Sequence, residues 1–189
     1  MKKFKHKGIC MILVMIILAV GYVFGFKHIN AEFPTDDVRI YKEGAIAEYN
    51  GLKIKVISGE VLTTDDIYNK YGYDMREDDI QDINNMVVWV EVENTLNTDN
   101  KIDIMGFTGL KGLWSNGNDL YAVWGLNGDD FSAELAPGET KKIGSVFVIN
   151  SDIKELLNEN TEWRLRISEW PNRMEFVVPV QISEGVSAS

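Results

Sequence analysis

The chain has 189 residues, which is enough for one domain of ordinary size behind a short targeting segment. Acidic side chains dominate, because 29 Asp and Glu stand against 19 Lys and Arg and give a formal net charge of −10 at pH 7. A nucleic acid is therefore excluded as a partner, since phosphate binding needs a basic footprint. The single cysteine, Cys10, excludes an intrachain disulfide.

The first 26 residues differ from the rest of the chain. Four lysines within the first seven residues precede an uncharged, apolar run at residues 8–26. As a helix with a rise of about 1.5 Å per residue, this run reaches about 28 Å, close to the thickness of a bilayer's hydrocarbon core. Few positive charges follow it, so the positive-inside rule keeps the N-terminus in the cytoplasm. We expect a single-pass cell-membrane protein that contacts the bilayer through residues 8–26 and exposes its C-terminal domain outside the cell.

Retention or removal of this segment decides whether the protein is anchored or secreted. A cleaved signal peptide has an apolar run of only about 7–15 residues, followed by small residues. Here the run is longer, and the nearest candidate cleavage site follows Ala31 in a poor context. We favour a signal anchor at 1–26, with secretion after cleavage near Ala31 as the alternative. Cys10 lies at the start of the run, where it cannot serve as a lipoprotein acceptor cysteine.

A polar connector at 27–43 leads into segments with strand-like patterns. Alternation of apolar and polar residues predicts half-buried strands, and it occurs at Leu52–Val56, Met86–Glu93, Glu162–Ser168 and Met174–Ile182. Pro179 assigns the last of these strands to a sheet edge, where a missing N–H is tolerated. Shorter strand candidates lie at 101–105, 120–124 and 142–149.

The remaining signals complete an all-β domain. Seven or eight short strands separated by turn residues predict a sandwich of two antiparallel sheets over residues 44–182. The small, polar tail at 183–189 is expected to be disordered. Two short helices are expected, at Asp65–Tyr71 behind the N-cap Thr64 and at Asp152–Leu157 behind Ser151.

Catalysis is not expected in this domain. Both histidines, His6 and His28, flank the apolar segment, so the domain has no histidine base and no histidine-ligated metal. Gly-rich phosphate loops and the nucleophile-elbow motif are absent from the sequence. A pair of carboxylates is expected by chance among 29 acidic residues, so it is no evidence for a glycosidase. The sequence indicates a protein that is not an enzyme.

Several motifs together resemble a known family. Asn50–Val56 opens the series, Val87–Asn94 is followed by a polar turn and Ile102-Asp103-Ile104, and Leu135–Thr140 reads L-A-P-G-E-T. The series resembles the telokin-like, immunoglobulin-like domains of unknown function in exported proteins and lipoproteins of Gram-positive bacteria. The resemblance implies an immunoglobulin-like β-sandwich outside the cell, and it transfers no catalytic residue. This chain departs from the lipoprotein members because it lacks a lipobox cysteine.

One candidate metal site lies in an acidic segment, residues 60–82, with a net charge of −6. Ca²⁺ takes several oxygen ligands from such segments. The spacing of an EF-hand loop is absent, so a solvated acidic loop is the competing interpretation, and no other cofactor is expected. The candidate ligands are Asp74, Asp78, Asp79 and Asp82.

One candidate binding site is aromatic. Trp114, Tyr121 and Trp124 surround a loop rich in Gly and Asn, where exposed rings can stack on a sugar or anchor a protein. Burial of these rings in the core is the competing interpretation. The leading hypothesis is a membrane-tethered extracellular module that binds a protein or cell-envelope component. A carbohydrate-binding module assisted by Ca²⁺ and a structural spacer domain are the alternatives.

Overall fold

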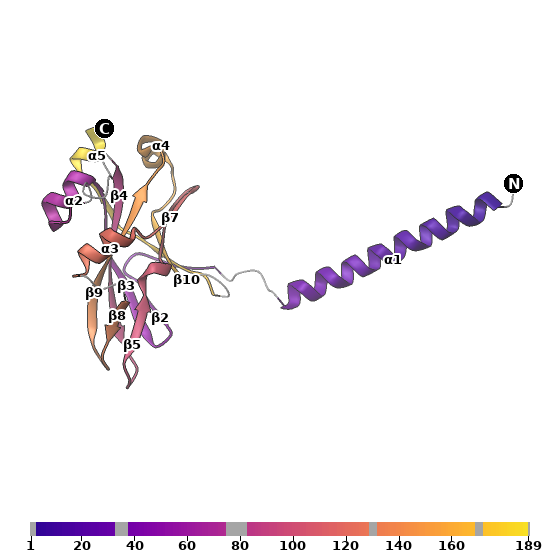
Figure 1. Cartoon of the computed structure of the whole chain (residues 1–189), viewed down its shortest axis with the longest axis horizontal. Coiled ribbons are helices and arrows are strands. Elements are labelled where there is room, and N and C mark those ends of the chain that lie inside the picture. The colour runs from indigo at the N-terminus through magenta and orange to yellow at the C-terminus, as the bar shows by residue number, and fades with distance from the viewer. Residues whose placement is uncertain (1–2, 33–37, 75–82, 129–131, 169–171, 189) are drawn as a thin grey trace. The chain divides into compact units, whose positions relative to one another are not determined.

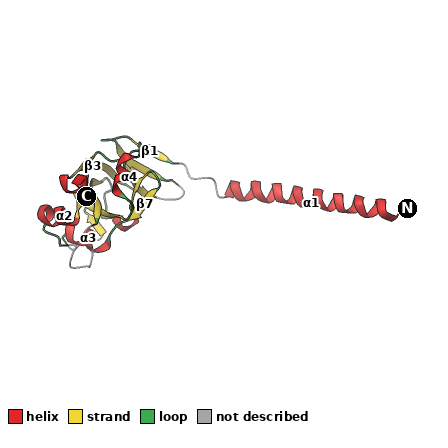
Figure 2. Ribbon diagram, turned by 90° about the horizontal axis from the view of Figure 1, so that it is seen from above, coloured by secondary structure: helices red, strands yellow, loops and turns green. Residues whose placement is uncertain are grey.

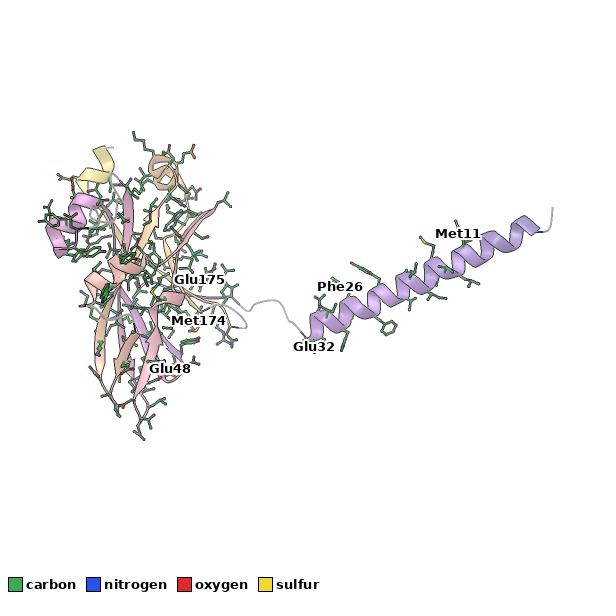
Figure 3. All side chains as sticks on the ribbon, in the orientation of Figure 1. Met11, Phe26, Glu32, Glu48, Met174 and Glu175 are labelled. Carbon is green, nitrogen blue, oxygen red and sulfur yellow. The ribbon has the colours of Figure 1, made fainter. Side chains whose placement is uncertain are left out.

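The computed structural model describes residues 3–32, 38–74, 83–128, 132–168 and 172–188. The chain divides into two compact units, Met1–Asp37 and Val38–Ser189. The predicted N-terminal hydrophobic helix is confirmed as α1 (Lys3–Glu32). From Met11 to Glu32 it is long and apolar enough to be a membrane anchor or a signal sequence. Its apolar side chains, among them the labelled Met11 and Phe26, are exposed within this unit (Figure 3).

The second unit is the expected β-sandwich (Figure 1). Sheet 1 has the order β1 (Arg39–Tyr41), β11 (Met174–Val177), β10 (Arg164–Ser168), β6 (Thr108–Lys111) and β7 (Trp114–Gly117). Sheet 2 has the order β12 (Val180–Ile182), β3 (Leu52–Thr63), β4 (Asn84–Asn94) and β9 (Thr140–Ile149), with β2 (Ile46–Tyr49) paired to β3. A two-stranded sheet joins β5 (Asn100–Asp103) and β8 (Ser132–Leu135).

Strand alternation places the core where the sequence predicts it. In β4, Val88, Val90 and Val92 are fully buried between the sheets, and Trp89 faces the other side. The main core joins these valines to large side chains such as Phe147 of β9. A second, smaller cluster lies on the opposite face of sheet 2, beneath α2 (Thr64–Tyr71), and contains Leu62, Ile67, Val87, Ala122 and Val146.

Two strand pairings depart from the antiparallel prediction. β1 pairs with β11 in parallel, and β12 pairs with β3 in parallel. The expected single strand over Met174–Ile182 is wrong, because Val178 and Pro179 carry the chain from sheet 1 to sheet 2. The backbone N–H of Val178 donates to Trp163 O, while Pro179 O accepts from the N–H of Gly59. Pro179, which has no N–H, therefore stands where the chain changes sheets, directly before an edge strand.

The helices begin at other caps than predicted. α2 starts behind Thr63, whose side chain accepts from the N–H of Asp66 in a capping box, so Thr64 is its first residue. α4 (Ile153–Asn158) is capped by Asp152 rather than by Ser151. The predicted strand at 120–124 is wrong and is replaced by a helix, α3 (Leu120–Leu126). The side chain of Asp119 caps α3 by accepting from the N–H of Ala122.

Both ends of the domain are more ordered than expected. The predicted connector 27–43 contains a strand, β1. The strand is held against the domain by Tyr41, whose ring stacks on that of the core residue Phe176 at 4.9 Å between centroids. The tail expected to be disordered contains α5 (Glu184–Ala188), with Val186 buried. α5 lies beside α2 in both ribbon views (Figures 1 and 2), and Ser183 Oγ donates to Asp66 Oδ2 at 2.6 Å.

Candidate anion-binding groove

The outer face of sheet 1 carries a groove of about 360 Å³. It crosses β11 and β10 and reaches the β6–β7 hairpin. Its lining residues are Leu110, Lys111, Gly112, Leu113, Trp114, Ser115, Thr161, Glu162, Arg164, Arg166, Arg173 and Glu175. We call it the arginine groove.

Strand register brings the charged groups of the groove together. In β10, Leu165 and Ile167 are buried in the core, so Arg164 and Arg166 point to the outer face. In the antiparallel pair β10–β11, Arg166 lies opposite Glu175. Glu175 consequently shares the outer face with both arginines. Figure 3 labels Glu175 and its neighbour Met174. Arg173, two residues before Glu175, supplies a third guanidinium.

Glu175 is bound by all three arginines. Arg173 Nε donates to its Oε1 at 2.7 Å, Arg166 Nη2 donates to Oε1 at 3.3 Å, and Arg164 Nη1 donates to Oε2 at 3.3 Å. These groups cover the carboxylate, whose side chain is only 3% exposed. Burial alone would raise the pKa of Glu175, but the hydrogen bonds and charges of the arginines, Arg173 above all, outweigh burial and hold the pKa below its ordinary value.

The groove is locally positive on a strongly acidic chain. Its lining holds four cationic side chains and two carboxylates, a net charge of +2. After residue 31 the chain carries 14 basic and 29 acidic residues, a net charge of −15. Glu175 carries one negative charge against the three guanidiniums around it, and Glu162 pairs with Arg164 at 3.4 Å. This arrangement favours a negatively charged ligand.

Lys111 fixes one end of the groove. Its side chain is almost fully buried, and its Nζ donates to Thr161 O at 2.7 Å and to Glu159 O at 3.1 Å. Nζ also lies 5.2 Å from the centroid of the Trp163 ring. Burial lowers the pKa of Lys111, and the charge of Glu159 acts in the opposite direction. Lys111 ties the β6–β7 hairpin to the segment that follows α4.

Two buried donors in the groove residues lack partners among the described residues. They are the indole Nε1 of Trp114 and the Nε of Arg164, and the third such buried polar atom is Asn85 Oδ1, outside the groove. Buried polar atoms in native proteins are nearly always hydrogen-bonded, and an orphan atom calls for a reason such as a missing ligand or water.

The sequence also matches a family. Residues 35–174 match a family described as a domain of unknown function, DUF5028. The chain belongs to this family. No curated protein sequence matches the chain. The family description does not mention a telokin-like fold, so that part of the resemblance stays a prediction.

Three solved structures are similar to this DUF5028 protein. A functionally unknown protein from Listeria monocytogenes EGD-e has 10% identity and a TM-score of 0.50, over 72% of this chain and 82% of that one. The yjhA protein from Bacillus subtilis has 11% identity and a TM-score of 0.45, over 73% and 98%. An uncharacterised β-sandwich protein from Clostridium difficile 630 has 9% identity and a TM-score of 0.44, over 76% and 97%. At 10% identity, the likeness to the Listeria protein concerns the fold alone.

The structure does not bring the predicted aromatic residues together on one surface. Trp114 packs in the main core, edge-on to Trp163 at 5.9 Å between ring centroids, and also lines the arginine groove. Tyr121 and Trp124 lie on α3 of the DUF5028 domain, where they are 55% and 40% exposed. Their role in binding stays a prediction.

The predicted calcium site falls largely outside the described part of the chain. Asp74 is described, whereas Asp78, Asp79 and Asp82 lie outside the described residues. Within the described ranges, no group of three or more His, Cys, Asp or Glu side chains is arranged to hold a metal ion. The Ca²⁺ site therefore stays a prediction.

From the sequence alone, Arg164 and Arg166 were predicted only to lie on the polar face of the strand Glu162–Ser168. Sequence reasoning missed Arg173, Glu175 and Lys111. A signal was present, because R-L-R in one strand and R-M-E-F in the next place charges at alternate positions. Pairing the two strands as a hairpin would have set those charges side by side, but the register had to be known first.

Proposed function

We propose that the protein is a non-catalytic binding module, tethered to the outside of the cell membrane by α1, and that the arginine groove holds its ligand. The observation that carries the proposal is the groove itself, with a net charge of +2 on a chain whose remainder is strongly acidic. The ligand is an anionic component of the cell envelope or of a protein.

The chemistry of the groove supports binding rather than catalysis. A general base needs a group that can take up a proton near neutral pH. Glu175 has a lowered pKa and is occupied by three arginines. Guanidinium groups stay protonated and act as donors. The groove therefore supplies positive charge and hydrogen-bond donors, which recognise an anion.

The tether is supported by the lysines before the apolar run and by the length of α1. Protease added to intact cells tests its direction. We expect the second unit to be degraded there, as it also is in lysed cells. A domain that is protected in intact cells and degraded only after lysis would overturn the extracellular assignment.

Ligand binding is tested with the full chain in detergent micelles and cell-envelope material from its own host. We expect this material to retain the wild-type chain, and Arg164→Gln to reduce retention several-fold. Lys154→Gln makes the same charge change on the exposed surface of α4 and should leave retention unchanged. Equal retention of Arg164→Gln and wild type would refute the role of the groove.

The exposed rings on α3 favour carbohydrate binding as a second candidate function. Tyr121 and Trp124 are three residues apart on this helix, so they lie on neighbouring positions of its surface. Aromatic faces can stack on sugars. In the same retention assay, this candidate predicts that Trp124→Ala loses retention while Arg164→Gln keeps it.

A further inference from the structure

Sheet 2 ends in β9, a long strand whose outer edge has no strand beside it in the described part of the chain. β9 has ten residues, whereas the other strands at sheet edges, β1, β2, β5, β7, β8 and β12, have three or four each. A short edge strand offers few backbone groups to another chain, and a long one is a template for strand pairing. β9 is therefore the edge at which this domain is most open to strand addition.

The sequence of β9 adds to this tendency. Its segment Ile143–Ile149 reads I-G-S-V-F-V-I and contains neither a charged residue nor a proline. Segments of about six or seven residues with strong β propensity and low charge stack on copies of themselves when they are exposed at an edge. Charges and prolines are the usual protection of an edge strand, and this segment has none. Another part of the chain has to protect it.

The chain from β7 to the end of α3 supplies side-chain amides along this edge. Asn127 Oδ1 accepts from the N–H of Gly144 at 2.8 Å, and Asn127 Nδ2 donates to Gly144 O at 2.9 Å. A residue of a neighbouring antiparallel strand would make the same pair of bonds. The amide of Asn127 thus takes the place of a strand residue.

The next two outward-facing residues of β9 are covered in the same way. Asn118 Oδ1 accepts from the N–H of Val146 at 3.0 Å, and the backbone N–H of Asp119 donates to Val146 O at 2.7 Å. Asn116 Nδ2 donates to Val148 O at 2.8 Å. Alternate residues of a strand direct their backbone groups to the same edge, so these bonds cover successive pairing sites.

The amides are held in place from the α3 side. Asn127 Nδ2 also donates to Val123 O at 2.6 Å, and Asn118 Nδ2 also donates to Ile104 O. α3 lies against β9 (Figure 1) and buries Val123. Side-chain amides satisfy the edge without forming a further strand, so they leave no new ladder that another chain could extend.

We infer that Asn116, Asn118 and Asn127 form an asparagine cover that prevents β9 from pairing with β9 of a second copy of this chain. Two identical strands can pair antiparallel about a two-fold axis, which makes a second copy the natural occupant of this edge. The hazard is greatest for a chain that α1 confines to a membrane, because confinement raises the effective concentration of copies. The inference concerns the state of assembly and does not depend on the ligand of the arginine groove.

The test removes the cover from the full chain in detergent micelles. We expect Asn118→Ala/Asn127→Ala to form larger assemblies than wild type, measured by sedimentation velocity in a density-matched detergent. At a low ratio of chain to detergent, amides of the segment Ile143–Ile149 should exchange with deuterium at least about ten-fold faster than in wild type, because hydrogen bonds at the edge are lost. At a high ratio they should exchange slowly again, because the strand then pairs with the second copy.

A milder variant keeps the test available if the double variant does not fold. Asn116→Ala removes one bond to β9 and leaves α3 intact. We expect it to associate at a higher chain-to-detergent ratio than the double variant, and at a lower ratio than wild type. α1 is the same in every variant, so any association through this helix is common to all of them.

Two controls separate exposure of the β9 edge from loss of stability. Asn94→Asp disturbs the bonds of Asn94 to Leu135 O and Ala136 O without touching the outer edge of β9. Asn158→Ala removes an amide at the exposed end of α4. Both should keep the assembly state of wild type.

Three results would overturn the inference. Association of Asn94→Asp equal to that of the double variant would mean that association follows from lost stability. Fast exchange in the segment Ile143–Ile149 without association would mean that the exposed edge does not pair. Unchanged exchange in a folded double variant would mean that the amides do not protect the edge.

Discussion

Glu175 reduces the electrostatic repulsion among the three arginines that surround it. Three guanidiniums would repel one another on adjacent strands, and the carboxylate between them converts repulsion into three ion pairs. The side chain is nearly inaccessible, so removal of its charge leaves the arginines poorly compensated. Loss of one partner from a buried ion pair typically costs about 3–5 kcal/mol.

We therefore predict that Glu175→Gln lowers the free energy of unfolding by about 3 kcal/mol. Urea denaturation of the full chain in micelles, followed by tryptophan fluorescence, measures the change. Glu162→Gln is the matched control, because Glu162 pairs with Arg164 at 3.4 Å and its side chain is 57% exposed. Its effect should stay within about 1 kcal/mol. Equal effects of the two variants would show that Glu175 is not a buried partner.

Glu175 also makes the stability of the domain depend on pH, with a contribution that is lost at acid pH. The pKa of Glu175 in the folded state lies below its usual 4.5. The unfolded state therefore binds the proton more readily, and the ion pairs contribute fully above pH 4.5. The contribution is lost as the pH falls through the lower, folded-state pKa. We predict that the difference in stability between wild type and Glu175→Gln is constant from neutral pH to about 5 and shrinks below that. A difference that persists unchanged at acid pH would contradict this assignment.

At the scale of elements, Asn94 joins two of the motifs that carried the family resemblance, Val87–Asn94 and Leu135–Thr140. Its Nδ2 donates to Leu135 O at 3.0 Å and to Ala136 O at 3.1 Å, and its Oδ1 accepts from the N–H of Leu96 at 3.0 Å. The backbone adds two bonds to the L-A-P-G-E-T turn, from the N–H of Gly138 to Asn94 O and from the N–H of Asn94 to Glu139 O. The end of β4 is thereby bound to the turn between β8 and β9.

Substitution of Asn94 should weaken this connection between β4 and the β8–β9 turn. We predict that Asn94→Asp lowers the free energy of unfolding by about 2–3 kcal/mol, because a carboxylate replaces the donor that faces the carbonyls of Leu135 and Ala136. Chemical denaturation measures the effect. Asn158→Asp, at the exposed end of α4, makes the same change at the surface and should be nearly neutral. The explanation fails if both substitutions cost the same.

The elements that were predictable are those whose pattern is long. Twelve residues of β3 and eleven of β4 alternate for long enough to fix strand type and the buried face. α3 has only seven residues, and the local pattern of L-Y-A-V-W does not separate helix from strand, although Asp119 offered a cap. In Met174–Ile182, the alternation continues across Pro179 while the chain changes sheets, so periodicity alone could not reveal two strands. The arginine groove depends on the register of β10 against β11, which is set by tertiary pairing.

At the scale of the whole molecule, the chain combines an apolar helix with an acidic domain, and each is compact by itself. The exposed apolar surface of α1 needs a lipid or membrane environment, because water would otherwise surround 14 large apolar side chains between Met11 and Ile29. Retention of α1 determines whether the domain acts at the membrane or away from it. Under the proposed function, the tether would raise the local concentration of the groove at the membrane only if the helix is kept.

The anchored state predicts a distinct behaviour of the full chain in its host. We expect the chain to stay in the membrane fraction after alkaline carbonate extraction, to be released by detergent, and to retain its N-terminus by mass spectrometry. Ile17→Lys places a charge at the centre of the apolar run, where insertion becomes less favourable by about 3 kcal/mol, and should release the chain from the membrane fraction. Ile17→Val keeps the apolar character and should behave as wild type. A chain in the culture medium that begins near Glu32 would mean that α1 is a cleaved signal peptide, and the domain would then be in solution rather than at the membrane.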